Sequence, residues 1–532
     1  MAGEATKDIE ALKALSMIQD SPLLGDWLVI MPIVIPFLAA SGIVMMRQRV
    51  DRHAELAMGT CLLMTLFNLA LLLKVLREGV VVMEMGNWLP PFGIVFVVDA
   101  VGALFALTTS VLGFATAWYA ANDLDMRTRR YGFFAFLMML ISGVSGAFLT
   151  GDVFNLYVWF EVLLIASFGL IIFGGEREQL DGAVRYAILN LIATTLFLIA
   201  TGFLYGITGT LNFADLARVI PELPDSAPIE TVGALYIFAF AMKAAAFPVG
   251  SWLPASYHTP KLVVGALFAG LLTKVGVYAI FRVNSLVFPT PDEAIRLTLL
   301  WVSLITMIVG VLGAIAQNDM RRTLGFLVVS GIGSMLLGVA LGTENGFRGA
   351  VLYAVHSMVV MTALYLVVGV IQRATNQRLM TEISGLYRAS SMLSIVFLTL
   401  VFAVSGLPPF SGFWPKVALL EAAIEVDEGF AAFILLLTGL LTSIAMGRMW
   451  AHTFWKPAEA LANQTVISTS VFRDPGRMLP VALLVAIVIA LGLFPNWLFV
   501  AANQGASGLI DPAAYIEATL AGTDRIMGGP SQ

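Results

Sequence analysis

The chain has 532 residues, of which 59% are hydrophobic and only 12% are charged, and its formal net charge is −5. A soluble protein of this length could not bury so much apolar surface, whereas a lipid bilayer is a natural solvent for it. The small net charge gives no reason to expect nucleic acid or an acidic ligand as a partner. The single cysteine, Cys61, lies in an apolar run, which excludes disulfides within the chain and a cysteine metal site.

The first 25 residues place acidic and basic side chains next to one another, with Glu4, Asp8 and Glu10 beside Lys7 and Lys13. A cleaved signal peptide begins with a basic segment, so this pattern does not fit one. We expect instead a short amphipathic segment ahead of the first membrane span.

Apolar stretches of about 17–25 residues, the length that crosses a bilayer as a helix, recur along the whole chain. We identify about fourteen of them, and the longest loop between them, 448–477, is too short for a soluble domain. In chain order the stretches are 27–46, 57–77, 94–121, 133–149, 152–173, 183–207, 231–253, 262–281, 296–316, 322–341, 348–371, 391–413 with a continuation to 425, 431–447 and 478–499. The sequence therefore predicts an all-α polytopic membrane protein of about fourteen transmembrane helices.

The distribution of basic residues predicts the orientation of this bundle. The loops after odd-numbered spans hold 18 lysines and arginines, whereas the two termini and the loops after even-numbered spans hold 9. Basic loops stay on the cytoplasmic side of a membrane. The odd loops are therefore expected in the cytoplasm and both termini on the outer side.

Three lysines fall inside the predicted spans, namely Lys243, Lys274 and Lys416. A lysine at the centre of a bilayer costs about 2.5–3.5 kcal/mol on insertion scales. A buried lysine also changes its charge state readily, which suits it to proton exchange. The alternative is a lysine tied to a carboxylate only to hold helices together.

Two further titratable residues lie deep in spans. Glu161 is near the middle of span 5, and an ion pair between Glu161 and Lys243 would relieve the cost of burying either charge alone. His356, with Ser357 beside it in span 11, can carry a proton near neutral pH, or it can be a hydrogen-bonded core residue. Asp99, near the start of span 3, is expected to cap a helix or pair locally.

Two spans are interrupted by proline. Span 7 contains "AFAMKAAAFPVGSWLP", with Pro248 and Pro254, and span 12 contains "SGLPPFSGFWPK", with Pro408 and Pro409. Irregular backbone at membrane depth is tolerated where it is buried in protein or lines a wet cavity. The alternative is that the prolines only kink the helices for packing.

The interrupted spans are five apart, so two five-span units, spans 4–8 and spans 9–13, would insert in opposite orientations. Broken helices at matching places in inverted repeats indicate an ion path. The predicted organisation is an N-terminal segment with spans 1–3 (1–130), a first inverted repeat (131–285), a second inverted repeat (286–450), and a loop, span 14 and tail (451–532).

Five stretches resemble the signatures of a known family: "TGDVFNLYVWFEVLLIAS", "AFAMKAAAFPVGSWLPASYHTP", "GLLTKVGVYAIFR", "AQNDMRRTLGFLVVSGIG" and "SGLPPFSGFWPK". In this order, over roughly 95–450, they resemble the antiporter-like subunits shared by respiratory complex I and Mrp-type cation/proton antiporters. "FLTGDVFNLYVWFEV" and "YGITGTLNFADLA" are most similar to the MrpD branch of the Mrp antiporters. The central complex I subunit of this type usually has glutamate where this chain has Lys416.

The resemblance implies a proton relay. By it, Glu161 modulates Lys243 on the first broken helix, Lys274 and His356 link two half-channels, and Lys416 is the terminal lysine on the second broken helix. It also implies a bacterial plasma membrane, a hetero-oligomeric complex with a larger homologous subunit, and exchange of protons for Na⁺ or K⁺. It implies no cofactor and no metal site.

The chain departs from the family pattern in two places. Gly331 stands where the family often has histidine or glutamine, and Gly250–Ser251 stand where it often has a polar ring residue. At these two places the chain has no family side chain to pass a proton on, so water molecules would have to carry it.

Three other functions remain open. A proton-pumping subunit of complex I or of a membrane-bound hydrogenase would share every feature above, but redox chemistry in partner subunits would drive it. A self-sufficient carrier of a small solute predicts transport by this chain alone. A structural scaffold is the third, and the three buried lysines speak against it. Since no phosphate loop, catalytic triad or metal cluster is visible, we do not expect an enzyme.

Overall fold

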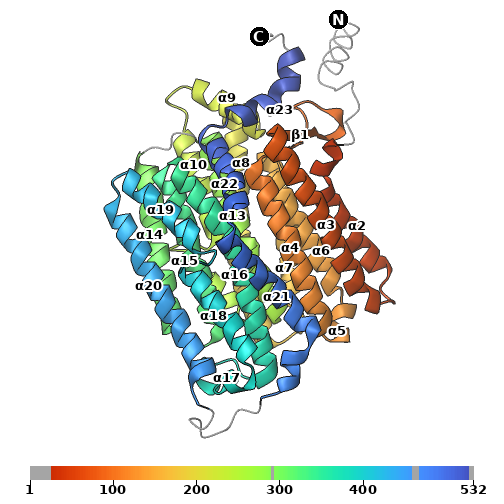
Figure 1. Ribbon diagram of the computed structural model, residues 1–532. Coiled ribbons are helices and arrows are strands. Elements are labelled where there is room, and N and C mark those ends of the chain that lie inside the picture. Colours follow the sequence, from red (N-terminus) through yellow and green to blue (C-terminus); the bar gives the residue numbers. More distant parts are fainter. Residues whose placement is uncertain (1–24, 289–292, 458–466, 527–532) are drawn as a thin grey trace, which may run out of the picture.

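Long apolar runs fold into helices here because a helix satisfies its own backbone hydrogen bonds where no water can do so. The computed structural model describes residues 25–288, 293–457 and 467–526. Its helices run side by side in one bundle, with both ends of the chain at the same side (Figure 1). The amphipathic segment expected at the N-terminus lies outside the described residues.

The N-terminal part comprises three long helices and a hairpin. Its elements are η1 (Asp26–Val29), α2 (Met31–Met45), α3 (Asp51–Glu78), β1 (Val81–Glu84), η2 (Met85–Asn87), β2 (Val95–Val98), α4 (Ala100–Asp123) and α5 (Met126–Arg130). The first repeat predicted from the sequence holds α6 (Phe133–Leu149), α7 (Val153–Ile171), α8 (Arg177–Thr208), α9 (Phe213–Val219), η3 (Ile220–Glu222), α10 (Ile229–Ala244), α11 (Trp252–Ser256), α12 (Leu262–Gly270), α13 (Leu272–Arg282) and η4 (Val283–Val287).

The second predicted repeat and the C-terminal part follow in the same bundle. The repeat holds α14 (Glu293–Ala316), α15 (Met320–Leu341), α16 (Glu344–Thr375), η5 (Met380–Glu382), α17 (Leu386–Ala389), α18 (Ser391–Ser405), α19 (Phe413–Glu425), α20 (Gly429–Trp450) and η6 (Ala451–Trp455). The C-terminal part holds η8 (Thr469–Arg473), α21 (Pro475–Leu493), α22 (Asn496–Ile510) and α23 (Ala513–Ile526).

The prediction of an all-α membrane bundle is confirmed. Each of the predicted apolar stretches contains a helix, and within the described ranges ten helical segments are long and apolar enough to cross a membrane. Three shorter apolar helices, α2, α6 and α18, accompany them. The last predicted span, 478–499, is only the middle of a longer path that α21 and α22 form together.

The start of the third predicted span is wrong. Residues Val95–Val98 form strand β2, which pairs antiparallel with β1, and helix α4 begins only at Ala100. The run "IVFVV" is rich in β-branched residues and short, so an apolar count cannot distinguish it from a helix end. The hairpin lies at the side of the bundle where both termini lie (Figure 1).

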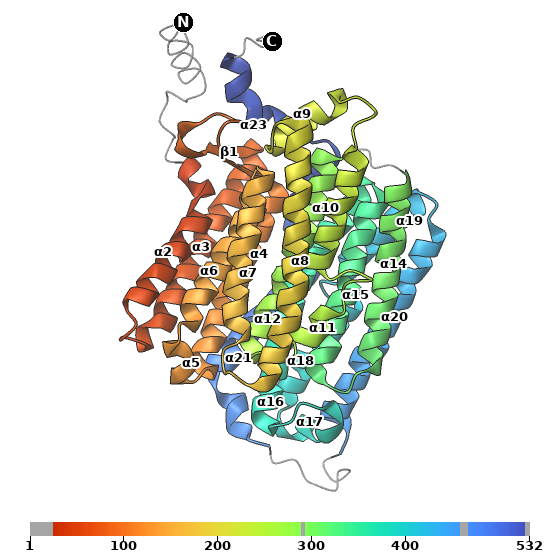
Figure 2. The ribbon, with the colours of Figure 1, turned by 180° about the vertical axis from the view of Figure 1, so that it is seen from behind.

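The two broken helices run in opposite directions through the bundle. In Figure 2, α10 lies above α11, so the first broken helix starts at the side of the termini. In Figure 1, α18 lies below α19, so the second starts at the opposite side, near α17. This arrangement agrees with the inverted orientation that the spacing of the two breaks predicts.

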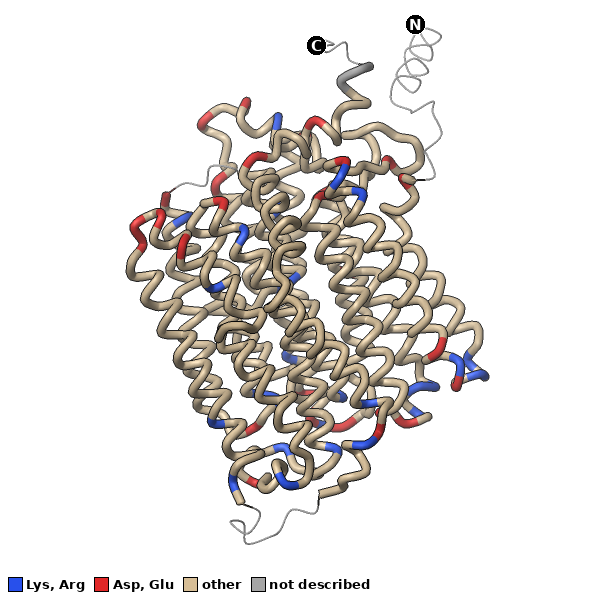
Figure 3. Tube along the Cα trace, viewed as in Figure 1, with Lys and Arg blue, Asp and Glu red and all other residues tan. Residues whose placement is uncertain are grey.

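Charged residues gather at the two ends of the bundle. Basic residues are concentrated at the end that carries α5 and α17, and acidic residues dominate the end near the termini (Figure 3). Between these ends the chain is almost wholly uncharged, with a few basic positions in the interior. Those interior positions are where a function must be sought.

Candidate functional site

The first helix break follows directly after Lys243. Helix α10 ends at Ala244, and Ala245 takes a left-handed conformation (φ 66°). Backbone groups freed by the break find partners: Trp252 Nε1 donates to the Met242 carbonyl at 3.0 Å, and the Phe247 amide donates to Thr306 Oγ1 at 3.0 Å. These polar groups at the break are thus paired, whereas Phe247, Pro248 and Ser251 are exposed on the surface of this chain.

Lys243 lies in the last turn of α10 and is 5% exposed. Its amine lies over the ring of Phe160 on α7, 5.4 Å from the ring centroid. Among the residues that the structure describes, this amine has no hydrogen-bond partner. A buried ammonium without a hydrogen bond is costly, so the site favours a lysine that can give up its proton.

The predicted ion pair between Glu161 and Lys243 is not closed in this structure. The Lys243 amine makes no hydrogen bond to Glu161 or to any other described residue. The reason is the helical turn: Phe160 faces inward from α7 and is fully buried, whereas its neighbour Glu161 points aside and stays half-buried. The Phe160 ring therefore takes the place next to the amine.

Lys274 marks a third interruption, which no proline announces. Helix α12 ends at Gly270 and α13 begins at Leu272, with Leu271 between them at φ −112° and ψ −54°. Lys274 is fully buried, and its amine donates to the Ala269 carbonyl, at the end of α12, at 2.6 Å. The interruption supplies the acceptor that holds this amine.

A glycine brings the helices of the first two lysines together. A side chain on Gly276 of α13 would lie 2.7 Å from the backbone nitrogen of Ala244, next to Lys243. Only a residue without a side chain permits this close approach. The end of α10 is therefore packed directly against the helix that carries Lys274.

His356 lies on the long, fully buried helix α16 and is 3% exposed. Its Nδ1 is 2.8 Å from Ser411 Oγ, in the break between α18 and α19. A side chain on Gly412, the next residue of the break, would meet the imidazole at 3.0 Å. The histidine is hydrogen-bonded, and it lies against the second broken helix.

Lys416 lies on α19, after the second break, and is half-buried. Its amine reaches back across the break and donates to the Ser405 carbonyl, the last residue of α18, at 2.6 Å. The C-terminal end of a helix carries partial negative charge, which stabilises a cation there. Gly406, which ends α18 in a left-handed conformation (φ 81°), leaves the room that the lysine side chain fills.

The proline positions of both breaks contact neighbouring helices. The Pro254 carbonyl, in α11, lies 2.9 Å from His258 Nδ1. A side chain on Gly492 of α21 would lie 2.2 Å from the carbonyl of Pro409, so α21 packs directly against the second break. The peptide bonds before Pro248 and Pro409 are both cis.

The two departures from the family pattern have a steric explanation. A side chain on Gly250 would lie 2.3 Å from the Ala245 carbonyl, and one on Gly331 would lie 3.1 Å from the ring of Tyr353. The backbone of the first break thus fills the space at Gly250, and an aromatic ring limits it at Gly331.

Sequence reasoning missed one buried ion pair. Arg282 at the end of α13 is 2% exposed, pairs with Asp99 and donates through Nε to the Tyr278 hydroxyl at 2.8 Å. Asp99 also caps α4 through the Gly102 amide at 2.9 Å, as expected, but its charged partner is distant in sequence. The rings of Tyr278 and Tyr515 cover the guanidinium.

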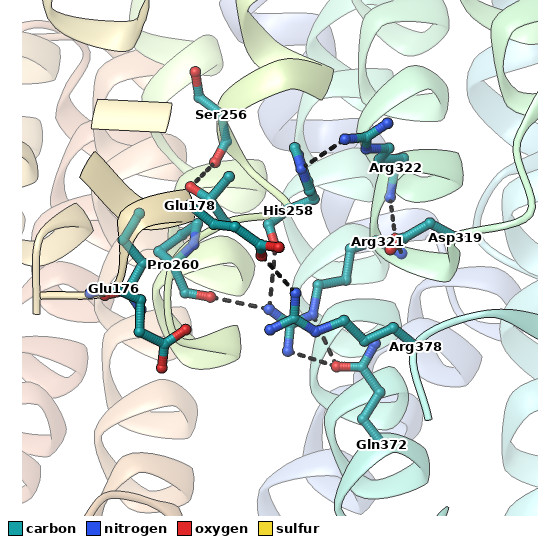
Figure 4. Close-up of polar contacts among 12 residues, drawn as sticks. Glu176, Glu178, Ser256, His258, Pro260, Asp319, Arg321, Arg322, Gln372 and Arg378 are labelled. Carbon is teal, nitrogen blue, oxygen red and sulfur yellow. Dashed lines mark hydrogen bonds and ion pairs between the residues drawn. The ribbon is translucent and has the colours of Figure 1, made fainter. Parts of the chain in front are cut away.

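A polar cluster lies at the end of the bundle opposite the termini, where α8, the segment after α11, α15 and the end of α16 meet (Figure 4). Arg321 donates to Gln372 Oε1 and to the carbonyls of His258 and Pro260. Arg378 pairs with Glu178 at 2.9 Å. The cluster joins elements of both predicted repeats.

Known proteins resemble this chain along nearly its whole length. The family described as "NADH:quinone oxidoreductase/Mrp antiporter, TM" matches residues 150–442. The D subunit of the Na(+)/H(+) antiporter of Alkalihalophilus pseudofirmus is 36% identical over 496 residues, which are 93% of this chain and 99% of that protein.

Two solved structures share the fold. A chain of the Mrp complex from Dietzia sp. DQ12-45-1b superposes with a TM-score of 0.86 at 29% identity, covering 94% of this chain and 100% of that one. A chain of the archaeal membrane-bound sulfane sulfur reductase superposes with a TM-score of 0.85 at 22% identity, covering 93% and 100%.

Proposed function

This chain belongs to the family of membrane subunits shared by NADH:quinone oxidoreductase and Mrp antiporters, and on that basis we propose that it carries protons as the D subunit of a multisubunit Na⁺/H⁺ antiporter. It is a multi-pass transporter subunit, and we expect no bond-making chemistry of its own. Na⁺ is the cation named for its relative at 36% identity, and K⁺ is the second cation to be tested.

The proton path that we propose runs from Lys243 through Lys274 and His356 to Lys416. One observation carries it: each of these four side chains lies at an interruption of a helix or contacts one directly. Interruptions at membrane depth are where backbone carbonyls and water can reach a titratable group. Three lysines and a histidine kept only for packing would not all need to lie at or against interruptions of helices.

Glu161 is proposed to modulate Lys243 from the neighbouring helix face. Its carboxylate is half-buried at membrane depth, where exposure to lipid would be costly. We infer that a partner subunit, the larger homologous one among the candidates, covers this face of α7. Closure of the Glu161–Lys243 pair would then depend on the assembled complex.

A redox-driven pump subunit is the main rival. The likeness to the sulfane sulfur reductase chain, at 22% identity, concerns the fold alone and does not distinguish the two. The relative at 36% identity over almost the full length of both chains is an antiporter subunit, which favours antiport.

The proposed location is a bacterial plasma membrane, with both termini on the outer side and the basic end, with α5 and α17, in the cytoplasm (Figure 3). A reporter that is active only in the cytoplasm, fused after Gln532, should be silent, and the same reporter inserted between Arg129 and Arg130 should be active. The opposite pattern would overturn this orientation.

The decisive experiment is purification from native membranes in mild detergent, with mass identification of the subunits and reconstitution into vesicles. An imposed Na⁺ gradient should drive proton movement, reported by a pH-sensitive dye. Lys274→Gln, whose amide can still donate to the Ala269 carbonyl, should abolish this movement, whereas Lys261→Gln, outside the path, should not. Co-purification with quinone-reducing subunits and no Na⁺-driven proton movement would favour the rival, and transport by this chain alone would favour a solute carrier.

A further inference from the structure

A pocket of about 340 Å³ opens at the cytoplasmic end of the first broken helix. Its lining includes Ser251 and Pro254 of the break, Glu178 and Asp181 of α8, His258, and Arg322 of α15. The pocket therefore leads from a charged rim to Ser251 and Pro254 of the first break. His258 and Arg322 face one another across it (Figure 4).

The hydrogen bonds of His258 determine which of its nitrogens carries the proton. Nδ1 lies 2.9 Å from the Pro254 carbonyl, which can only accept, so Nδ1 must carry a hydrogen. Nε2 lies 3.0 Å from an arginine nitrogen of Arg322, which can only donate, so Nε2 must offer its lone pair. The imidazole is therefore neutral in this arrangement, and the bond to Arg322 exists only in the neutral form.

We propose that His258 is a cytoplasmic proton-binding residue of this subunit, and that uptake of a proton at Nε2 exchanges Arg322 for the carboxylate of Glu178 as its partner. The proton comes from cytoplasmic water and replaces the hydrogen bond from Arg322. The ring stays tethered to the Pro254 carbonyl through Nδ1 throughout. Displacement of the guanidinium then widens the pocket towards Thr259, a buried residue of its lining.

The charges around His258 support this exchange of partners. The charged groups that line the pocket are Glu178, Asp181 and Arg185 of α8 and Arg322 of α15. Around it lie Asp319, which caps α15, Arg321 of α15, and Arg378 after α16. Arg185 is paired with Asp181, and Arg321 is held by Gln372 and two carbonyls. Glu178, now shared with Arg378, is the carboxylate that an imidazolium in the pocket would meet.

The protonation equilibrium of His258 favours the neutral, Arg322-bound form at neutral pH. Burial, and next the nearby Arg322, lower the pKa of His258 below its ordinary value of 6.5. Above pH 6.5, His258 is therefore almost entirely in the neutral form bound to Arg322. This form is lost as the pH falls through the lowered pKa. A side chain on Gly325 would lie 3.3 Å from Cα of Pro254, so α15 packs against the same segment of the break.

Proton binding by His258 serves antiport only if the proposed function holds, so it is tested without a transport assay. The protonation of each histidine is measured in the isolated complex by hydrogen–deuterium exchange at imidazole C2, read by mass spectrometry. His258 should titrate below 6.5, and Arg322→Gln, which removes the cation, should raise its pKa. His452, outside the pocket, should titrate alike in both proteins.

Accessibility tests the opening. Thr259 lines the pocket and is buried, so in Thr259→Cys, labelling by a membrane-impermeant thiol reagent from the cytoplasmic side should rise by up to about tenfold per pH unit as the pH falls towards the His258 pKa, relative to Arg52→Cys at an exposed distant position. His258→Gln should abolish this rise, and His452→Gln should leave it. A His258 that titrates at 6.5 with or without Arg322 would overturn the proposal. So would labelling of the Thr259→Cys variant that follows labelling of the Arg52→Cys variant at every pH.

Discussion

The two broken helices are built alike, but they hold their lysines differently. Each first half ends in a left-handed residue, Ala245 in one and Gly406 in the other. Lys243 comes before its break, and its amine lies over an aromatic ring without a hydrogen bond to any described residue. Lys416 comes after its break, and its amine is fixed on the carbonyl that ends α18.

The difference indicates a division of labour between the two lysines. A hydrogen bond to a charged group contributes about 1.5–3 kcal/mol, and a helix end adds about 0.3–1 kcal/mol for a cation. The charged form of Lys416 has both of these stabilising contacts. The charged form of Lys243 has a cation–π contact and the nearby charge of Glu161, but no hydrogen bond to a described residue. Lys243 is therefore the lysine whose charge responds most to a neighbouring carboxylate, and Lys416 is the one held ready at a fixed acceptor.

The largest effect is expected from Lys416→Arg. Arginine keeps the charge and a donor for the Ser405 carbonyl, so the complex should assemble, but it cannot release a proton in a protein. Antiport in everted vesicles should fall to the level of vesicles without the complex. The measurement is dequenching of a pH-gradient dye, with complex content checked on a native gel and Lys456→Arg as the control. Full activity would mean that Lys416 only holds helices together.

Removing the carboxylate beside Lys243 should come next. Glu161→Ala leaves the least supported of the buried lysines without a carboxylate on α7, so exchange should collapse at normal expression. Glu161→Asp keeps the charge on a shorter side chain and should retain partial activity. Lys416 donates to the Ser405 carbonyl, so its charged form should not depend on a carboxylate in the same way. Wild-type exchange in Glu161→Ala would remove Glu161 from the mechanism.

Ala245 and Gly406, the left-handed residues that follow α10 and α18, allow a matched pair of substitutions. A side chain on Gly406 would lie 2.5 Å from Cδ and 2.8 Å from the amine of Lys416, so Gly406→Ala should displace the lysine and lower exchange strongly while the flexible side chain allows folding. Ala245→Gly should instead remove about 1–2 kcal/mol of left-handed strain and raise the thermal stability of the complex. Equal losses of exchange in both variants would contradict the distinction.

The smallest effect is expected at Phe160. Phe160→Leu keeps a buried apolar side chain but removes the ring under the Lys243 amine, a contact of about 0.5–2 kcal/mol. Exchange should fall several-fold, with no change in complex content. Phe240→Leu, also in the aromatic cluster, removes a ring that makes no cation–π contact with any residue that the structure describes, and it is the control. Equal activity of the two variants would mean that the ring does not tune Lys243.

The helix breaks at spans 7 and 12 could be predicted because proline removes a backbone donor wherever it stands. The buried lysines could be predicted because a charge inside an apolar run has a known cost. The interruption at Leu271 could not, because the residues "AGLLTK" contain no proline and a single glycine is common in membrane helices. The one feature of the sequence that pointed to this interruption was Lys274, because a buried amine needs a hydrogen-bond acceptor such as a free backbone carbonyl.

Pairing was the least predictable property. Glu161 and Lys243 are the obvious ion pair by depth in their spans, but the ring of Phe160, the residue before Glu161, lies next to the amine. Arg282 looks like the basic edge of a span, and its partner Asp99 lies 183 residues earlier, so neither residue reveals the other. Such contacts depend on which helices become neighbours, and hydrophobic periodicity does not contain that information.

Chain synthesis sets the order in which the end of the bundle near the termini is completed. Proteins are made from the N-terminus, so Asp99 and Arg282 are inserted long before α23 exists. Tyr515 of α23 then lays its ring over the guanidinium, 5.2 Å from it. A ribosome that stops before α23 therefore leaves a bundle with all three membrane lysines and an unfinished cover over its buried arginine.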